Sequence, residues 1–224
     1  MWEGRMAIKQ RGNGVNNNRS GVWRPASPLL RVGGFCYRAF NLTGQNLMNF
    51  CSECGSPVVL AIPDGDHLPR HVCGQCGTIH YQNPKMVVGC IPEWEDRILL
   101  CKRAIEPRYG LWTLPAGFME NGETTLEGAV RETWEEAGAR IEVGGLYTLF
   151  NLPHINQVYF MFRARLLDLD FAPGIESLET RLFTEAEIPW DHIAFRTVRV
   201  TLEQYFKDRH AGAFDFHFGD IRTR

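Results

Sequence analysis

GFMENGETTLEGAVRETWEEAGA, residues 117–139, is the stretch of sequence that decides the fold of this chain. We expect a helix over residues 124–137, because Thr124 and Thr125 can cap its start and no proline interrupts it. Gly138 can then end the helix in the left-handed conformation. At about 100° per residue, such a helix carries an apolar stripe and, on nearly the opposite side, an acidic stripe. The apolar stripe is Leu126, Ala129, Val130, Thr133 and Ala137, and the acidic stripe is Glu132, Glu135 and Glu136.

The three glutamates suggest a cation site. Carboxylates three and four positions apart on a helix repel one another, and a hard divalent cation placed among their oxygens would turn that repulsion into affinity. A solvated acidic face is the ordinary explanation for two neighbouring glutamates and a glycine. The spacing here is richer: Gly117, five residues, Glu123, seven residues, Arg131 and Glu132, two residues, Glu135 and Glu136, one residue, Gly138. Seven fixed positions match by chance in roughly one of 10⁸ placements at a ~7% background per residue type.

This spacing resembles the signature of the Nudix hydrolases, GX5EX7REUXEEXGU. Thr133 and Ala139 depart from its bulkier aliphatic positions, but both are packing positions. The oxygen donors expected around Mg²⁺ or Mn²⁺ are the Gly117 carbonyl and the carboxylates of Glu132, Glu135 and Glu136, which are hard ligands. The resemblance implies that Glu123 and Arg131 form a supporting salt bridge. It leaves the general base open among Glu135, Glu136 and a downstream glutamate, with Glu176 the first choice and Glu179 the second.

A second motif precedes the first. Cys51-x-x-Cys54, eighteen residues and Cys73-x-x-Cys76 have the spacing of a four-cysteine zinc ribbon, in which a hairpin carries the thiolates to a tetrahedral Zn²⁺. A site with four protein ligands has no open position, so we interpret the zinc as structural and not the cysteines as a redox dithiol. Between residues 49 and 82, Arg70 is the only Lys or Arg, which argues against nucleic acid as a partner.

Alternating apolar residues predict strands on both sides of the central helix, at 86–91, 97–103, 111–117, 140–143, 146–152 and 157–166. A short strand is expected in the acidic segment 172–189, and a second amphipathic helix at 195–208. Strands around one long helix, with a closing helix, predict a mixed sheet between two helices, an α/β/α sandwich. This is the fold that the Nudix resemblance implies.

The composition limits where the protein works. A chain of 224 residues with a net charge of −2 and no apolar run of about 18 residues predicts no membrane span. Seven cysteines, four of them in metal-type pairs, favour a reducing compartment, which we take as the cytoplasm.

The sequence predicts four segments. Residues 1–47, rich in Gly, Asn and Arg with Glu3 as the only acid, are expected to be a disordered extension, a start placed too early, or a transit peptide. The zinc ribbon then covers 48–82, the catalytic domain 83–210 and a tail 211–224. The oligomeric state is left open, with a homodimer as one option.

The substrate class follows from the resemblance alone. Nudix enzymes hydrolyse a nucleoside diphosphate linked to another group, and over residues 49–218 the chain is similar to zinc-ribbon Nudix proteins related to FAD and ADP-ribose pyrophosphatases. We therefore expect FAD or ADP-ribose as the small-molecule substrate, with Arg103, Phe118 and Glu179 as candidate contacts. An NADH pyrophosphatase is the first alternative, but the SQPWPFPxS motif of those enzymes is absent here. A non-catalytic nucleotide sensor is the second, and the complete set of box glutamates argues against it.

Overall fold

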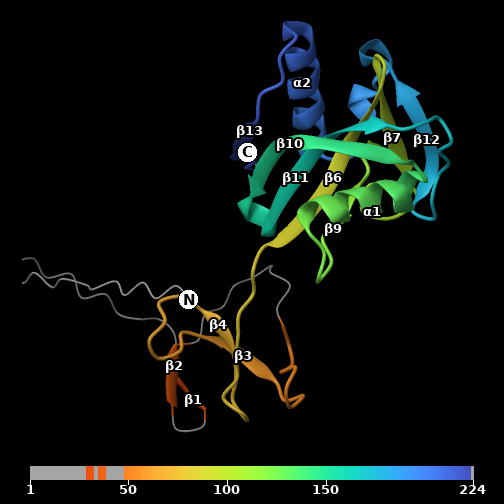
Figure 1. Cartoon of the computed structure of the whole chain (residues 1–224). Helices are drawn as coiled ribbons and strands as arrows, with labels where there is room; N and C mark the ends of the chain where they lie inside the picture. Colours follow the sequence, from red (N-terminus) through yellow and green to blue (C-terminus); the bar gives the residue numbers. More distant parts are fainter. Residues whose placement is uncertain (1–28, 33–34, 39–47, 223–224) are drawn as a thin grey trace, which may run out of the picture. The chain divides into compact units, whose positions relative to one another are not determined.

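The protein is described from a computed structural model, which covers residues 48–222 and the strands at 29–32 and 35–38 (Figure 1). The remaining residues of the predicted extension 1–47, and residues 223–224, lie outside the described part of the chain. The chain divides into two compact units, Met1–Gln82 and Asn83–Arg224.

The described residues of the first unit form two small sheets. β1 (Leu29–Val32) and β2 (Phe35–Arg38) form an antiparallel hairpin that the sequence analysis did not predict. β3 (Val58–Ala61), β4 (Arg70–Cys73) and β5 (Ile79–His80) form a three-stranded antiparallel sheet in that order. The predicted hairpin between the two cysteine pairs is therefore confirmed.

The second unit is built on an eight-stranded mixed sheet with the order β12-β7-β6-β11-β10-β13, in which β8 pairs with β7 and β9 with β6. The pairs β6–β11 and β10–β13 are parallel, and the other pairs are antiparallel. The strands are β6 (Lys85–Trp94), β7 (Arg97–Arg103), β8 (Trp112–Thr113), β9 (Ala116–Phe118), β10 (Ile141–Leu152), β11 (Gln157–Leu166), β12 (Ser177–Phe183) and β13 (His217–Asp220). Short 3₁₀ helices occupy Pro153–Ile155, Glu185–Glu187 and Trp190–His192.

Two helices cover the faces of this sheet, α1 (Thr125–Ala137) and α2 (Arg196–Ala211) (Figure 1). Side chains alternate along a strand, so β6 presents Val88 and Cys90 to one face and Ile91 to the other. Val88 and Cys90 pack with Ala129 of α1, whereas Ile91 packs with Leu202 and Tyr205 of α2. Because both faces are buried, the predicted α/β/α sandwich is confirmed.

The structure changes three details of the predicted strands. The expected strand at 111–117 is two short strands, since Pro115 has no N–H to donate to a ladder. The strands expected at 140–143 and 146–152 are the single strand β10, whose register shifts between Val143 and Leu146. Strand β13 lies within the predicted tail 211–224 and adds to the edge of the sheet beside β10.

Helix α1 has the predicted ends. The Glu127 N–H donates to Thr124 Oγ1 at 3.2 Å and the Thr124 N–H donates to Glu127 Oε2 at 2.8 Å, which is a capping box. Gly138, with φ of 58°, ends the helix and donates its N–H to the Trp134 carbonyl. Both signals are local, which is why the sequence predicts them well.

The predicted faces of α1 are partly wrong. Ala129, Thr133 and Ala137 are buried, but Leu126 and Val130 are 44% and 36% exposed. Glu132 and Glu136, expected on the far side, are only 8% and 6% exposed. The helix therefore buries a face turned toward its glutamates, because β9 and the segment before β12 cover that side.

No helix in the described part of the chain is long and apolar enough to cross a membrane.

A buried carboxylate joins α2 to the sheet and yields a stability prediction. Asp208 Oδ2 accepts a hydrogen bond from the Tyr147 hydroxyl of β10 at 2.9 Å and from the Asp215 N–H at 3.2 Å, and it lies 2.7 Å from His217 Nε2 of β13. Burial alone would raise the pKa of Asp208, but the hydrogen bonds from His217 and Tyr147 outweigh it, so the pKa lies below its usual value. The charged form therefore contributes stability above the unfolded pKa of about 4.

We expect Asp208→Asn to lower the free energy of unfolding by about 1–3 kcal/mol at neutral pH. Wild-type stability should fall as the pH drops through about 4 and below, whereas the variant should lose less over the same range. Urea titrations of both proteins at several pH values measure this, with Asp215→Asn as the control, since only the backbone of Asp215 takes part. Parallel pH profiles for wild type and Asp208→Asn would contradict the assignment.

Candidate active site and zinc site

Arg131 of α1 organises the acidic residues of the second unit. Its guanidinium donates two hydrogen bonds to Glu123, at 2.8 and 2.9 Å, and one each to Glu132 at 2.7 Å and Glu135 at 2.9 Å. A fifth bond, of 3.1 Å, goes to the Phe118 carbonyl. The bond to Arg131 lowers the pKa of Glu123 to about 2. The structure therefore contains the ion pair between Glu123 and Arg131, and this pair holds the loop after β9 against the helix.

Glu132 and Glu136 are carboxylates buried beside β9. Burial raises the pKa of Glu132, and burial together with the charge of Glu132 raises the pKa of Glu136 to about 8. The Ala116 N–H donates to Glu136 Oε2 over a long 3.4 Å. Gly117 lies so close that a Cβ there would be 2.3 Å from Glu132 Oε2, so a larger residue would require the Glu132 carboxylate to move from this position. The backbone of Gly117 and two carboxylates are thereby brought together.

The segment before β12 closes the other side of these glutamates. The Ala172 N–H donates to the Ala137 carbonyl at 2.9 Å, and the Gly174 N–H donates to the Glu136 carbonyl at 3.0 Å. A Cβ at Gly174 would be 1.7 Å from the Glu135 carbonyl oxygen, so this docking needs a glycine. Glu176 follows and is fixed by a 2.8 Å bond from the Ala104 N–H to its carbonyl. The loop thus places Glu176 in the same cavity as Glu132, Glu135 and Glu136.

That cavity has a volume of about 1060 Å³. It has an acidic end, formed by the four glutamates, and walls that include Arg103, Phe118 and Tyr159. Of the predicted substrate contacts, Arg103 and Phe118 line it, but Glu179 does not, because it lies on β12 with its carboxylate 3.8 Å from Lys102 Nζ. Three further lining residues at the start of α2 were not predicted from the sequence: Phe195, Arg196 and Thr197.

The donor set of the acidic end fits a hard divalent cation. Two buried carboxylates, a more exposed third and the backbone of Gly117 are oxygen groups, and Mg²⁺ and Mn²⁺ prefer such ligands. Glu132 and Glu135 are bonded to Arg131 in this structure. Neighbouring carboxylates repel one another, and burial removes the water that would solvate their charge. A cation bound among them would therefore stabilise their charged forms.

The four cysteines of the first unit form the zinc site. Their sulfur atoms lie within 4.8 Å of one another, with 3.6 Å between Cys51 and Cys76 and 3.5 Å between Cys54 and Cys73. Zn–S bonds of about 2.3 Å in a tetrahedron require sulfur atoms slightly under 4 Å apart, so the set fits Zn²⁺. The left-handed Gly55 and Gly77 turn the backbone, and the N–H groups of Glu53 and Cys76 point at Cys51 and Cys73 sulfur atoms. This arrangement has four protein ligands and is structural.

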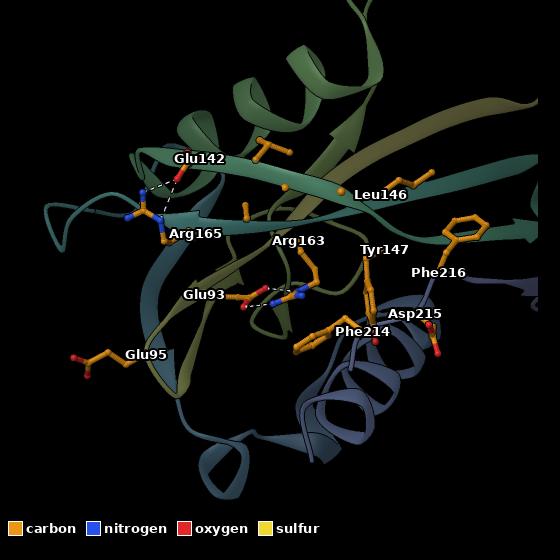
Figure 2. A pocket seen from close by; sticks show the side chains of 14 residues that line it. Glu93, Glu95, Glu142, Leu146, Tyr147, Arg163, Arg165, Phe214, Asp215 and Phe216 are labelled. Carbon is orange, nitrogen blue, oxygen red and sulfur yellow. Dashed lines mark hydrogen bonds and ion pairs between the residues drawn. The ribbon is translucent and has the colours of Figure 1, made fainter. Parts of the chain in front are cut away.

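A second cavity, of about 750 Å³, lies at the other end of the sheet, beside Tyr147 and Phe214 (Figure 2). Arg163 in its wall donates bonds of 2.7 and 2.9 Å to Glu93 and stacks 3.3 Å from the centre of the Phe214 ring. Arg165 is likewise bonded to Glu142. Because both arginines are already paired with glutamates, neither guanidinium in this cavity is left for an anionic ligand, and the acidic cavity remains the candidate active site.

Comparisons with known proteins agree with this assignment. A family model described as Nudix N-terminal matches residues 49–82, and the NUDIX domain model matches residues 83–205. A crystal structure of a NUDIX hydrolase from Nitrosomonas europaea is 63% identical, with a TM-score of 0.76, and the match covers 79% of this chain and all of that one.

Two curated relatives carry specific names. An NAD-capped RNA hydrolase NudC of Chromobacterium violaceum is 37% identical over 132 residues, which cover 55% of this chain and 47% of that protein. An ADP-ribose pyrophosphatase of Methanocaldococcus jannaschii is 31% identical over 121 residues, or 50% of this chain and 70% of that protein. The chain therefore spans about half the length of the NAD-capped RNA hydrolase.

The zinc site leads to a prediction about the first unit. Cys51→Ser should release zinc and lower the melting temperature, because a four-cysteine site supplies folding free energy to the small sheet around it. Elemental analysis should find one zinc per chain in wild type and in the control Ser52→Ala, whose side chain is exposed, and less in Cys51→Ser. Wild-type protein purified under reducing conditions with four free thiols and no zinc would refute the site.

Proposed function

This chain belongs to the Nudix hydrolases, and from that membership we propose that it hydrolyses the pyrophosphate bond of a nucleoside diphosphate linked to a second moiety. The substrates we favour are FAD and ADP-ribose, which would yield AMP with FMN or ribose 5-phosphate. The observation that carries the proposal is the convergence of Glu132, Glu135, Glu136 and Glu176 on one cavity large enough for a dinucleotide.

The residues that would hold Mg²⁺ or Mn²⁺ are Glu132, Glu135, Glu136 and the carbonyl of Gly117. When bound, such a cation supplies charge neutralisation at the phosphate oxygens and activation of the attacking water. The protein's own part is positional. Arg131 fixes the carboxylates of Glu132 and Glu135 relative to the loop held by Glu123, so the acidic end is shaped before substrate arrives.

Glu176 is the general base that we favour. It lines the cavity with the box glutamates, and its loop is bonded to the last turn of α1, so its distance from Glu136 is set by backbone hydrogen bonds. A carboxylate held in this way can take a proton from water in a fixed orientation. Glu135 and Glu136 remain alternatives for this role, whereas Glu179 is outside the cavity.

The walls of the cavity support a dinucleotide with a large second half. Tyr159, Phe195 and the exposed Phe118 offer rings on which an adenine or isoalloxazine can stack. Arg103 lines the cavity 5.0 Å from the centre of the Phe195 ring, and its charge acts to lower the pKa of Glu136, so we expect it to contact the diphosphate. The name of the archaeal relative supports ADP-ribose in particular.

Nicotinamide nucleotides, including NAD-capped RNA, are a second class of substrate that the activity assay must include. Arg70 of the zinc ribbon is paired with Asp66 at 2.8 Å, so the ribbon offers no free cationic surface among its described residues for a polynucleotide. The RNA in the name of the bacterial relative nevertheless makes NAD-capped RNA, NADH and NAD necessary controls. We place the reaction in the cytoplasm, where zinc-binding thiolates stay reduced.

The metal ligands are tested by a change that keeps their shape. Glu136→Gln removes a carboxylate that would be charged when it holds the cation at the reacting phosphate, and it should lower kcat by at least ~10²-fold, with a smaller effect on the melting temperature. The matched control is Glu142→Gln, far from the cavity and exposed, which should turn over like wild type. Glu176→Gln should also lower kcat, while Glu179→Gln should not. Wild-type turnover by Glu136→Gln would contradict the assignment of Glu136 as a metal ligand of the active site.

The bond that breaks is tested with isotopic water. Attack on phosphorus leaves the sugar C–O bonds intact, so hydrolysis in ¹⁸O-water should place the label in one phosphate-bearing product, and on the same side in every turnover. Mass spectrometry of the products from FAD, ADP-ribose, NADH, NAD and NAD-capped RNA measures both the label and the preferred substrate. Release of free adenine, nicotinamide or riboflavin without labelled phosphate would show that another bond is cleaved.

A further inference from the structure

The first turn of α2 opens into the active-site cavity without a cap. Phe195 precedes the helix and has no side-chain acceptor for its N–H groups, and the first N–H bonded to a backbone carbonyl is that of Arg199, which reaches Phe195 at 3.0 Å. The N–H groups of Arg196, Thr197 and Val198 belong to the set that a helix leaves without internal partners. Phe195, Arg196 and Thr197 all line the cavity. A helix of 16 residues therefore directs the positive end of its dipole into this space.

The Thr197 hydroxyl is a second, independent sign of a ligand at this place. Thr197 is 3% exposed, and its Oγ1 has no hydrogen-bond partner among the described residues. It also borders a recess of about 30 Å³ that continues the cavity between Tyr159 and Phe195. Leaving a buried hydroxyl unsatisfied is unfavourable, so such groups call for an explanation. The recess is large enough for one water-sized group, so a ligand oxygen at the start of α2 would supply the missing partner directly or through such a water.

The charges along the cavity wall indicate the sign of that ligand. Of the arginines lining the cavity, Arg131 is bonded to glutamates and Arg222 to Asp220. Arg103, Arg108 and Arg196 also line it, and none of them forms an ion pair with a carboxylate in the described part of the chain. Arg196 donates to the Arg222 carbonyl at 3.0 Å, so its other N–H groups remain for a ligand.

Arg103 can serve the scissile diphosphate, because it lies near Glu136. Arg196, the Thr197 hydroxyl and the open N–H groups of α2 are a second group of donors in the same cavity, next to the Phe195 ring over which Arg103 lies. A diphosphate held at the acidic end leaves this second group of donors without an acceptor. The cavity is thus equipped for more negative charge than one diphosphate carries.

We propose that the start of α2, with Thr197 Oγ1 and Arg196, binds a second phosphoryl group of the substrate, a phosphomonoester on a ribose hydroxyl of the nucleotide. This inference rests on the proposed function and narrows its substrate class. A phosphomonoester offers three acceptor oxygens and a charge near −2 at pH 7, which matches several N–H donors, one hydroxyl and one guanidinium. The same chemistry arises from a 2′-phosphate or a 3′-phosphate, and the test separates them.

The test compares nucleotide fragments that differ by one phosphate. Isothermal titration calorimetry of the full chain with AMP, adenosine 2′,5′-bisphosphate and adenosine 3′,5′-bisphosphate gives three Kd values. One bisphosphate should bind at least ~10-fold more tightly than AMP, and the better of the two identifies the ribose position. Matched hydrolysis of NAD against its 2′-phosphate, and of dephospho-coenzyme A against coenzyme A, should show the same preference in kcat/KM.

Two variants locate the effect. Thr197→Val keeps the side-chain shape and Arg196→Gln removes an exposed charge, and each should bring the ratio of AMP Kd to bisphosphate Kd toward one. Lys207→Gln, which removes an exposed charge from the same helix away from the cavity, should keep the wild-type ratio. A melting temperature for Thr197→Val at or above that of wild type shows that this variant is folded, since it loses only an unsatisfied hydroxyl.

Three results would overturn the inference. Equal Kd values for AMP and both bisphosphates in the wild type would remove it and leave the proposed function intact. A preference that survives in both Thr197→Val and Arg196→Gln would place the second phosphate elsewhere. Failure to bind any of the three nucleotides, together with no hydrolysis of any dinucleotide, would remove the proposed function and the inference together.

Discussion

The contact between Arg131 and its carboxylates is the constraint on which the active site depends. The carboxylates of Glu132, Glu135 and Glu136 lie on adjacent turns of one helix and repel one another. Burial of two of these side chains makes the repulsion stronger. One guanidinium, with five donors in a fixed plane, bonds Glu132 and Glu135 and also Glu123 and the Phe118 carbonyl. A lysine has a single ammonium and could not hold these groups at defined angles. The arginine thus joins the helix, the loop before it and strand β9 into one acidic structure.

Close approach of the backbone is the second requirement of this design. Gly117 and Gly174 lie where any Cβ would meet Glu132 or the Glu135 carbonyl, so two segments far apart in sequence reach the same helix from opposite sides. Their approach explains why the buried face of α1 includes glutamates, against the simple rule that charged residues face water. The glycine of the box thus lets β9 lie against the Glu132 carboxylate, in addition to its proposed role as a carbonyl ligand.

Local signals in the sequence predicted most of the fold, and long-range contacts account for what they missed. The ends of α1 follow from Thr124 and Gly138, and strands β7 and β11 have the predicted bounds because alternation marks them. Three features depend instead on which elements meet in space. They are the choice of the face that α1 buries, the addition of β13 at the edge of the sheet, and the exclusion of Glu179 from the cavity. The helix at 195–208 was predicted, but the place of its first residues in the cavity was not, because only the fold shows that Phe195, Arg196 and Thr197 line it and that the Thr197 hydroxyl has no partner. An uncapped helix start was the one available hint.

The loop from Ala172 to Glu176 has a consequence for how such a protein can change over evolutionary time. Its backbone is bonded to α1 at Ala172 and Gly174, and to Ala104 at Glu176, so its anchors do not involve the side chain of Ile175. That side chain is 99% exposed and borders the mouth of the cavity. Exposed side chains without such anchors can usually be replaced at little cost in folding free energy. Single substitutions at position 175 can therefore change which substrates the cavity admits. Glu176 meanwhile keeps its position relative to α1, because backbone hydrogen bonds hold it.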